Sequence, residues 1–230
     1  MENENHENRI VTTGLHDLDK ITGGFQPGQV IVLAARPIMG KTALVLEWAA
    51  HLAKQRGKII ALFELELTKD EIEKRLLPLD LDPLSASQIV VDDSPGLSAT
   101  DIFERCKALK GARGRLDLVI VDYLQLMLDR GPPKKRNCEN LRQLKEAAKI
   151  LNCPIIVLSQ VSRSLESRSD KRPILIDLRE SAPIESNADI IMFIYRDDYY
   201  YNDCSEKNVA EIIIAKNRAG NIGTVKVKFK

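Results

Sequence analysis

Apolar runs alternate with amphipathic segments along most of this chain. The runs are bounded by turn residues and rich in β-branched side chains, which predicts strands over 29–35, 58–63, 88–91, 116–121, 154–159, 189–195, 209–215 and 225–229. Helical spacing of apolar residues predicts helices over 43–55, 68–77, 98–110 and a further segment that ends at 151. Alternating strands and helices predict a parallel α/β sheet, and the strand-rich end predicts an antiparallel extension. Ligands of such sheets bind at the carboxyl ends of the strands.

The segment 31–42 has the layout of a phosphate-binding loop. An apolar run stops at the sequence ARPIMGKT, and a long helical pattern follows. Successive loop N–H groups and the positive end of the helix dipole converge on an anion. Gly40 lets the backbone approach the phosphates, Lys41 reaches the β/γ oxygens, and the Thr42 hydroxyl can bind Mg²⁺.

The strict form of this loop begins with Gly, whereas Ala35 stands in that place here. Alanine there implies a backbone that does not need the positive φ that glycine adopts at little cost. The alternative interpretation is an ordinary strand–turn–helix junction that happens to contain Gly-Lys-Thr. The flanking strand and helix patterns favour nucleotide binding.

If the loop holds a nucleoside triphosphate, other strand ends should bring polar groups to the same edge of the sheet. Asp122 ends the apolar run LDLVIVD and can hold the water shell of Mg²⁺. Glu64 and Glu66 follow the run KIIALF, and one of them can deprotonate the attacking water. Residues two apart on an extended chain point the same way, so both can face the cleft, and their repulsion would then raise the pKa of one. Gln160 follows PIIVLS and can hydrogen-bond the γ-phosphate, so that hydrolysis releases the loop beyond it.

Each of these strand-end residues has a structural alternative. The aspartate can cap a helix or pair with a surface cation, the glutamates can be solvent-facing charges at the start of a helix, and the glutamine can cap its strand. Lys216 and Arg218 approach a turn that contains glycine, where cations are usually solvated. The segment 161–173 is rich in Ser, Arg and Asp, which predicts a mobile loop. Trp48 lies on a strongly apolar helix, which favours a core position over a base-stacking role.

Composition narrows the function further. At 230 residues, with 44% apolar residues and a net charge of +1, the chain is an ordinary globular protein without a globally basic surface, so any contact with nucleic acid must be local. The 4 scattered cysteines are typical of reduced cytosolic thiols. No apolar run is long enough to span a membrane, and the polar N-terminus is unlike a signal or transit peptide, so a cytoplasmic location is expected. We expect residues 1–12 to be a disordered segment or the remnant of a linker, and 13–230 to be one domain.

The motifs ARPIMGKT, FELELT, VIVDYLQLM, VLSQVSR, DLRES and IIAKNRAG together resemble, in this order, those of the replicative DNA helicase DnaB family. The resemblance is to the C-terminal, RecA-like ATPase domain and covers nearly the whole chain from about Thr13. Ala at the first place of the phosphate loop is usual in that family. The resemblance implies ATP-driven translocation on single-stranded DNA, 5′ to 3′, with duplex unwinding. It also implies ATP and Mg²⁺ as cofactors, a homo-oligomer in the form of a hexameric ring, and a primase or helicase loader as a partner.

The resemblance also implies a role for each matching residue. Glu66 rather than Glu64 matches the catalytic glutamate, because the family usually has a small residue at the earlier place. Lys41, the γ-phosphate sensor Gln160, and the basic pair Lys216 and Arg218 complete the catalytic set. The basic pair would reach the ATP of the neighbouring subunit, where an arginine finger is typically worth ~10³–10⁵ in rate, so this replaces the solvated-turn interpretation. The nucleotide-binding residues implied are Ile38, Met39, Gly40, Lys41, Thr42, Ala43, Arg75, Lys216, Asn217 and Arg218. The Mg²⁺ ligands implied are Thr42 and the Walker B aspartate Asp122. The DNA-binding residues implied are Arg163, Arg168, Lys171, Arg179, Glu180 and Ala182.

Two departures from the family pattern shape these expectations. The N-terminal domain of the family and most of the helix that links it to the motor are absent from the sequence, which predicts rings that are weak or that need nucleotide or DNA. The segment between Leu77 and Gln88 is shorter than usual. Two alternatives remain: a RecA-like ATPase of another role, such as a recombinase or a clock-type ATPase, and a short accessory protein that binds nucleotide or a helicase ring without unwinding.

Overall fold

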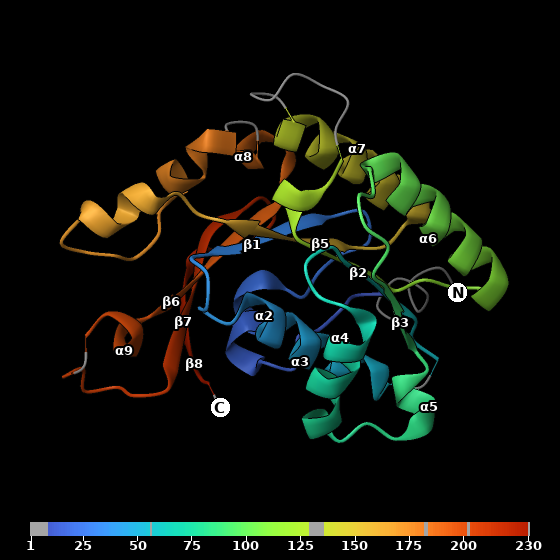
Figure 1. Cartoon of the computed structure of the whole chain (residues 1–230), viewed down its shortest axis with the longest axis horizontal. Helices are drawn as coiled ribbons and strands as arrows, with labels where there is room; N and C mark the ends of the chain where they lie inside the picture. The colour runs from blue at the N-terminus through green and yellow to red at the C-terminus, as the bar shows by residue number, and fades with distance from the viewer. Residues whose placement is uncertain (1–8, 56, 129–135, 182–183, 202, 230) are drawn as a thin grey trace.

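An eight-stranded sheet forms the centre of the protein, with the strand order β3-β2-β4-β5-β1-β6-β7-β8 (Figure 1). The computed structural model describes residues 9–55, 57–128, 136–181, 184–201 and 203–229, with the backbone alone at 136–138 and 179–181. The strands are β1 (Val30–Ala35), β2 (Ile60–Glu64), β3 (Ile89–Asp92), β4 (Leu118–Asp122), β5 (Ile155–Gln160), β6 (Ile190–Arg196), β7 (Val209–Asn217) and β8 (Gly223–Lys228). The strands β1 to β6 pair in parallel, whereas β7 and β8 are antiparallel. The predicted parallel sheet with an antiparallel extension is confirmed.

Helices cover both faces of this sheet (Figure 1). One face carries α2 (His16–Thr22), α3 (Lys41–Ala53), α4 (Lys69–Leu76) and α5 (Pro83–Ala86), and the other carries α6 (Ala99–Arg113), α7 (Arg136–Leu151) and α8 (Ile184–Asn187). The short helix α9 (Asp197–Tyr200) follows β6, and the 3-10 helices are η1 (Leu77–Leu79), η2 (Leu124–Leu126), η4 (Arg163–Ser167) and η5 (Leu175–Ser181). A capping box of Thr68 and Glu71 begins α4, because each side chain accepts a hydrogen bond from the backbone N–H of the other.

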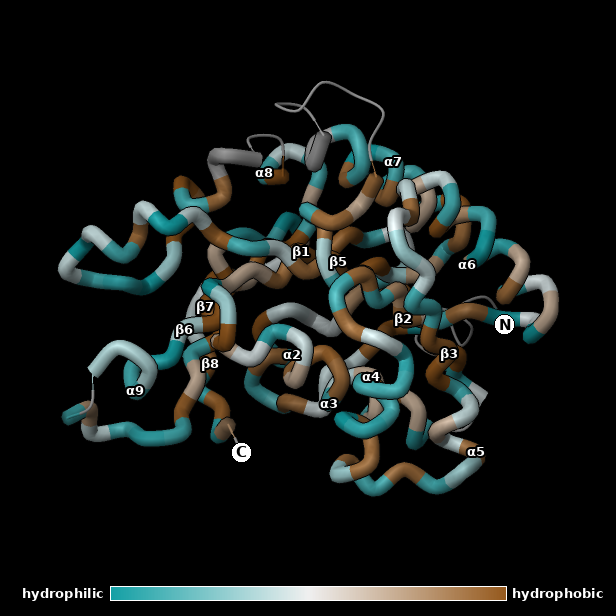
Figure 2. Tube along the Cα trace, viewed as in Figure 1, coloured by the Kyte–Doolittle hydropathy of each residue, from teal (hydrophilic) through white to brown (hydrophobic). Residues whose placement is uncertain are grey.

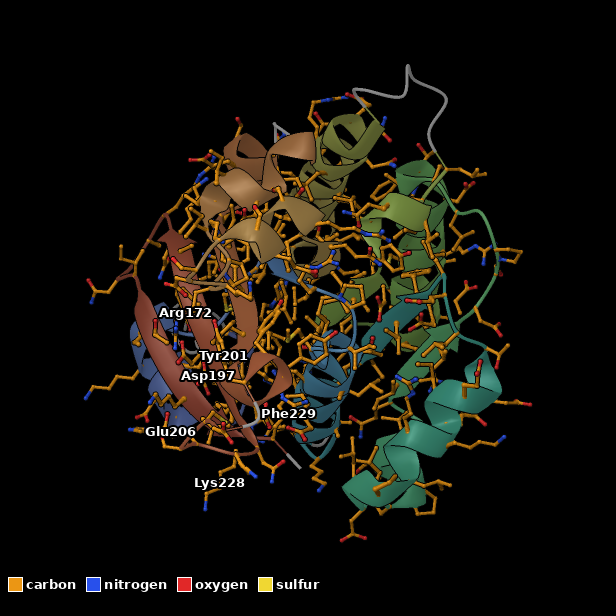
Figure 3. The ribbon with its side chains drawn as sticks, turned by 60° about the vertical axis from the view of Figure 1, so that its left-hand side comes forward. Arg172, Asp197, Tyr201, Glu206, Lys228 and Phe229 are labelled. Atoms are coloured by element: carbon orange, nitrogen blue, oxygen red, sulfur yellow. The ribbon has the colours of Figure 1, made fainter. Side chains whose placement is uncertain are left out.

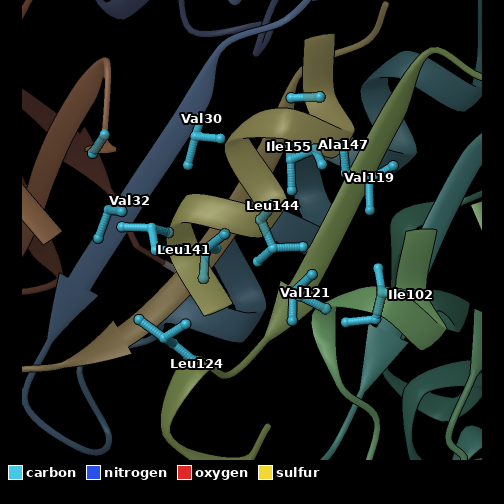
Figure 4. Packing of buried hydrophobic residues seen from close by; sticks show 14 of the residues in the cluster. Val30, Val32, Ile102, Val119, Val121, Leu124, Leu141, Leu144, Ala147 and Ile155 are labelled. Atoms are coloured by element: carbon cyan, nitrogen blue, oxygen red, sulfur yellow. The ribbon is translucent and has the colours of Figure 1, made fainter. Parts of the chain in front are cut away.

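Alternate residues of the central strands enter two hydrophobic cores, one on each face of the sheet. Val30 and Val32 of β1 belong to the core under α6 and α7, and Figure 4 shows them from close by, beside Leu141 and Leu144 of α7. Ile31, Leu33 and Ala35, at the alternate positions of β1, belong to the core on the side of α2 and α3. Because both faces of the sheet are covered, the strands appear as continuous apolar runs in the sequence, and Figure 2 shows hydrophobic residues along the central strands. Trp48 lies in the second core at 1% exposure, and its ring packs edge-to-face with that of Phe25, with ring centroids 5.8 Å apart, so its interpretation as a core residue is confirmed.

Two segments are more ordered than the sequence indicates. Val11 forms a bridge with Phe25 and is 1% exposed, so the folded part begins before residue 13, while residues 1–8 of the expected disordered segment lie outside the described residues. The segment 161–173, predicted as a mobile loop, contains η4, buries Leu165 and pairs its charges with distant residues. Composition does not reveal long-range ion pairs of this kind.

Candidate functional site

The phosphate loop joins the central strand β1 to α3. Ala35 remains in the extended strand and is fully buried, which agrees with a position that does not need glycine. Gly40 directly precedes α3 and has φ 93°, and Ile38 also has a positive φ of 68°. The positive φ of Gly40 favours glycine, and a Cβ there would also run into the Phe229 ring.

A cavity of about 420 Å³ opens directly over this loop. It lies at the carboxyl ends of β1, β2, β4 and β5, where the topology predicts a ligand. It therefore brings together residues from five separate parts of the sequence. The lining residues are Pro37, Ile38, Gly40, Lys41, Thr42, Ala43, Glu66, Leu67, Arg75, Asp122 and Gln160.

Thr42 and Asp122 form the oxygen-rich part of the cavity. The Thr42 hydroxyl donates a 2.6 Å hydrogen bond to Oδ2 of Asp122, which is the last residue of β4 and 2% exposed. Burial raises the pKa of Asp122, while the hydrogen bond from Thr42 and the charge of Lys41 oppose that shift. A hydroxyl and a carboxylate side by side fit Mg²⁺ that keeps water and phosphate as its other ligands. Within the described ranges, no group of three or more His, Cys, Asp or Glu side chains could hold a metal ion by itself.

Lys41 supplies the positive charge of the cavity. Burial lowers its pKa, and the carboxylates of Asp122 and Glu66 act in the opposite direction. Its Nζ lies 3.5 Å from the Ala35 carbonyl oxygen, so the side chain is folded back over the loop that it follows. A partly desolvated ammonium in this place gains strongly from a polyanionic ligand.

Glu64 and Glu66 occupy different environments, although they are two residues apart. The strand ends at Glu64 and the chain then bends, so Glu64 is 1% exposed while Glu66 lines the cavity. Oε1 of Glu64 accepts hydrogen bonds from the backbone N–H of Glu66 at 3.2 Å and of Leu67 at 3.1 Å. Burial, followed by the charge of Asp122, raises the pKa of Glu64 to about 8, and repulsion from Glu66 is the smallest cause. The expectation that both carboxylates share a face was wrong, because the alternation of an extended strand stops at Glu64.

Gln160 and Arg75 complete the cavity from two other elements. Gln160 ends β5, and its backbone N–H donates to Oε1 of Gln125 at 3.4 Å. Nε2 of Gln125 donates to the Ser159 hydroxyl at 2.9 Å, so Gln125 fixes this strand end. Gln125 belongs to the VIVDYLQLM motif but was not among the predicted site residues, because its hydrogen bonds with Ser159 and Gln160 are evident only in the fold. Arg75 lies in the last turn of α4 and reaches the cavity from the side.

The basic pair lies at the opposite edge of the sheet. Asn217 ends β7 and pairs with Ile190, the first residue of β6, so this turn is at the amino ends of the parallel strands. Lys216 donates hydrogen bonds to the carbonyl oxygens of Ala188, at 2.7 Å, and of Glu185. Burial and then the charge of Arg218 lower the pKa of Lys216.

Arg218 is fixed on the same side of the molecule as Lys216. Its Nη1 lies 3.2 Å from Oδ1 of Asp189, and its Nη2 donates to the Ser186 carbonyl oxygen. The structure therefore does not bring Lys216, Asn217 and Arg218 to the cavity of their own chain.

The candidate DNA-binding residues divide between two segments. Arg163 is exposed at the start of η4, whereas Nη2 of Arg168 donates to Asp177 at 2.9 Å and Nζ of Lys171 donates to the Glu166 carbonyl oxygen at 2.8 Å. Two further candidates, Arg179 and Glu180, lie in η5 with the backbone alone described, and Ala182 lies outside the described residues. In the described part of the chain, no helix has the length and apolar character needed to cross a membrane.

The amino-acid sequence of this chain is similar to those of known helicases. The model of the family described as "DnaB-like helicase C terminal domain" matches residues 10–82 and 77–230. The chain is 39% identical over 257 residues to the replicative DNA helicase DnaB of Geobacillus stearothermophilus, covering 100% of this chain and 56% of that protein. Its identity to the replicative DNA helicase DnaB of Haemophilus influenzae is 41% over 258 residues, covering 98% and 55%. The chain spans about half the length of the curated relatives it matches.

Solved structures give the same picture. The ATPase domain of G40P matches with a TM-score of 0.88 at 35% identity, covering 99% of this chain and 91% of that one. A DnaB-like replicative helicase, described together with its interactions with primase, matches with a TM-score of 0.88 at 34% identity, covering 100% of this chain and 62% of that one. The RadB recombinase matches with a TM-score of 0.64 at 18% identity over 96% of each chain, and this likeness concerns the fold alone.

Proposed function

The chain belongs to the DnaB-like helicase C-terminal domain family, with its RecA-like ATPase fold, and we propose that it is the motor domain of a replicative DNA helicase. In this proposal, ATP hydrolysis drives translocation on single-stranded DNA, 5′ to 3′, and unwinding of the duplex ahead. The observation that carries the proposal is the cavity over the phosphate loop, where Lys41, Thr42, Glu66 and Asp122 meet at the strand ends.

ATP and Mg²⁺ are the proposed cofactors of this cavity. The backbone of the loop 38–43, with Lys41, would bind the β- and γ-phosphates, and Arg75 would contact the nucleotide. Thr42 and Asp122 would hold Mg²⁺, which neutralises charge on the phosphates when bound. Glu66 would accept the proton of the attacking water, since it faces the cavity beside Lys41. Gln160 would contact the γ-phosphate from the end of β5.

Lys216, Asn217 and Arg218 would act on the ATP of a neighbouring subunit. They lie at the edge of the sheet opposite the cavity, so a single chain does not bring them to its own nucleotide. A homo-oligomer, proposed as a hexameric ring, would place this basic edge of one subunit against the cavity of the next. A cation in that place would stabilise charge that develops in the transition state.

Single-stranded DNA is the proposed track of this motor. Arg163, Arg168 and Lys171 would contact its phosphates, and the second segment, with Arg179, Glu180 and Ala182, would track its backbone. Contacts of this kind are local and tolerant of sequence, which agrees with a net charge of +1. A primase or a helicase loader is a proposed partner of the whole protein. The cytoplasm is the proposed location, since Cys106 and Cys153 are buried free thiols, as a reducing compartment permits.

ATP turnover per chain, measured over a range of protein concentrations with and without a thymidine oligonucleotide, tests this proposal. Because the catalytic cations come from a neighbour, turnover per chain should rise with concentration, and it should rise further with DNA. Light scattering with an ATP analogue and the oligonucleotide should detect the matching oligomer. Turnover that is independent of concentration and unaffected by DNA would refute the trans arrangement and the motor.

A further inference from the structure

Arg36 belongs to the phosphate loop, but its side chain does not line the cavity. It directly follows the last residue of β1, and its side chain is 13% exposed. Nε of Arg36 donates a 2.8 Å hydrogen bond to Oε1 of Glu166, and Nη1 donates to the Val161 carbonyl oxygen at 3.2 Å. One guanidinium therefore connects the phosphate loop to the chain that leaves β5 directly after Gln160.

Glu166 lies within η4, in the segment 163–171 that carries the first group of candidate DNA-binding residues. Its backbone carbonyl accepts a hydrogen bond from Lys171 at 2.8 Å, and Lys171 also donates to the Arg168 carbonyl oxygen at 3.1 Å. Leu165, between Arg163 and Glu166, is fully buried. These contacts make the segment a unit with a fixed internal arrangement, so a displacement of Glu166 is passed to its neighbours.

Contacts from the C-terminal part of the chain hold the far end of this segment and the residue that follows it, Arg172, which Figure 3 labels together with Tyr201. Arg172 donates two hydrogen bonds to the Glu211 carboxylate, both at 2.8 Å, and its guanidinium lies 4.5 Å from the centre of the Tyr195 ring. The Tyr201 hydroxyl donates to the Ser169 carbonyl oxygen at 3.2 Å. The segment is therefore anchored to the phosphate loop through Glu166, and to β6 and β7 through Arg172, which directly follows it.

We propose that the ion pair of Arg36 and Glu166 is the contact by which the phosphate loop positions the segment 163–171 and makes ATP turnover respond to single-stranded DNA. This inference rests on the proposed function. Arg36 is a positioning residue here, because it touches neither the cavity nor the DNA candidates directly. Coupling between two sites is reciprocal, so a contact that passes the state of the loop to the segment also passes DNA occupancy back to the loop.

Glu166→Gln tests this contact with little change of shape. The matched control is Glu206→Gln, which removes an ion pair with Lys226 that is about half exposed at both partners, as the Glu166 carboxylate is. We expect both variants to keep the basal kcat and KM for ATP of the wild-type chain. Stimulation of turnover by a thymidine oligonucleotide should fall about threefold in Glu166→Gln alone, the size that a partly exposed ion pair can carry.

DNA affinity separates positioning from a loss of structure or of binding. Glu166→Gln removes a negative charge from the segment that carries Arg163, Arg168 and Lys171, so anisotropy of a labelled oligonucleotide should show binding as tight as wild type, or tighter. Weaker stimulation with undiminished binding supports the inference. A parallel loss of both would assign Glu166 a merely structural role and overturn it.

A double-mutant cycle completes the test. If the two side chains act only through each other, Arg36→Gln combined with Glu166→Gln should lose no more stimulation than Arg36→Gln alone. Additive losses would overturn the inference, and so would a Glu166→Gln chain that responds to DNA like wild type. A wild-type chain that does not respond to DNA would refute the motor itself, and this result is evident before any variant is compared.

Discussion

Glu64 should make the stability of this protein fall as pH rises, and Glu64→Gln should remove that dependence. The carboxyl is 1% exposed, and its pKa is raised from 4.5 to about 8 by burial and by the charge of Asp122. In the unfolded chain it titrates near its ordinary value, so folding takes up a proton between the two pKa values. The free energy of unfolding therefore decreases as pH rises through that window and becomes level above it.

The magnitude follows from the size of the shift. Each pH unit inside the window is worth about 1.4 kcal/mol, so the contribution of Glu64 should change by about 4 kcal/mol between about pH 5 and about pH 8. Glutamine keeps an oxygen for the N–H groups of Glu66 and Leu67, but its amide replaces Oε2, which is buried without a partner. Burying that amide without a partner costs about 1–3 kcal/mol. The variant should thus be less stable than wild type in acid and more stable at alkaline pH.

Urea unfolding of both proteins, across that pH range and without nucleotide or Mg²⁺, measures this difference. The other titrating groups are common to both proteins, so their contributions largely cancel in the difference between the two free energies of unfolding. The change of this difference with pH therefore reports the titration of Glu64. The variant should also keep most of its ATP turnover, because Glu64 does not line the cavity. A difference that stays constant within about 1 kcal/mol over the range would refute the reasoning, since it would mean that Glu64 is ionised in the folded protein.

Four other substitutions, used in three tests, address the remaining parts of the site and the core. Glu66→Gln should lower ATP turnover by about 10²–10⁴-fold while a fluorescent ATP analogue still binds, and an active Glu66→Gln beside an inactive Glu64→Gln would reverse the assignment. Lys41→Ala and Arg218→Ala should each be inactive alone, but mixing them should restore part of the turnover, since some interfaces then combine an intact cavity with an intact arginine. No recovery in a mixture that forms oligomers would count against catalysis in trans. Trp48→Ala should lower the free energy of urea unfolding by about 3–5 kcal/mol, because the indole is 1% exposed against Phe25, and a loss below about 1 kcal/mol would contradict that packing.

Local patterns were sufficient for much of this fold. The continuous apolar runs predicted the strands, and the strand-rich end of the sequence predicted the antiparallel extension. The phosphate loop was also evident, because its chemistry depends on adjacent residues: a strand end, Gly40, Lys41 and Thr42 in direct succession. Asp122 and Gln160 were found by the same local rule, since each is a polar residue that ends a buried strand.

The relations between distant residues were decided only by the tertiary structure. Glu64 and Glu66 differ because the chain bends where β2 ends, which buries one carboxylate beside Asp122 and leaves the other in the cavity. The antiparallel pairing of β7 with β6 carries Lys216 and Arg218 to the edge opposite the phosphate loop, and no local pattern encodes that direction.

The segment 161–173 shows the same limit most clearly. Its composition is that of a solvated loop, yet Arg36 and Glu211 hold it through contacts that span 130 and 39 residues of sequence. Hydrophobic periodicity reports which face of an element is buried, and it therefore determines the elements and their layers. Ion pairs between remote segments depend on where the folded backbone brings their charges, so they exist only once the sheet has formed.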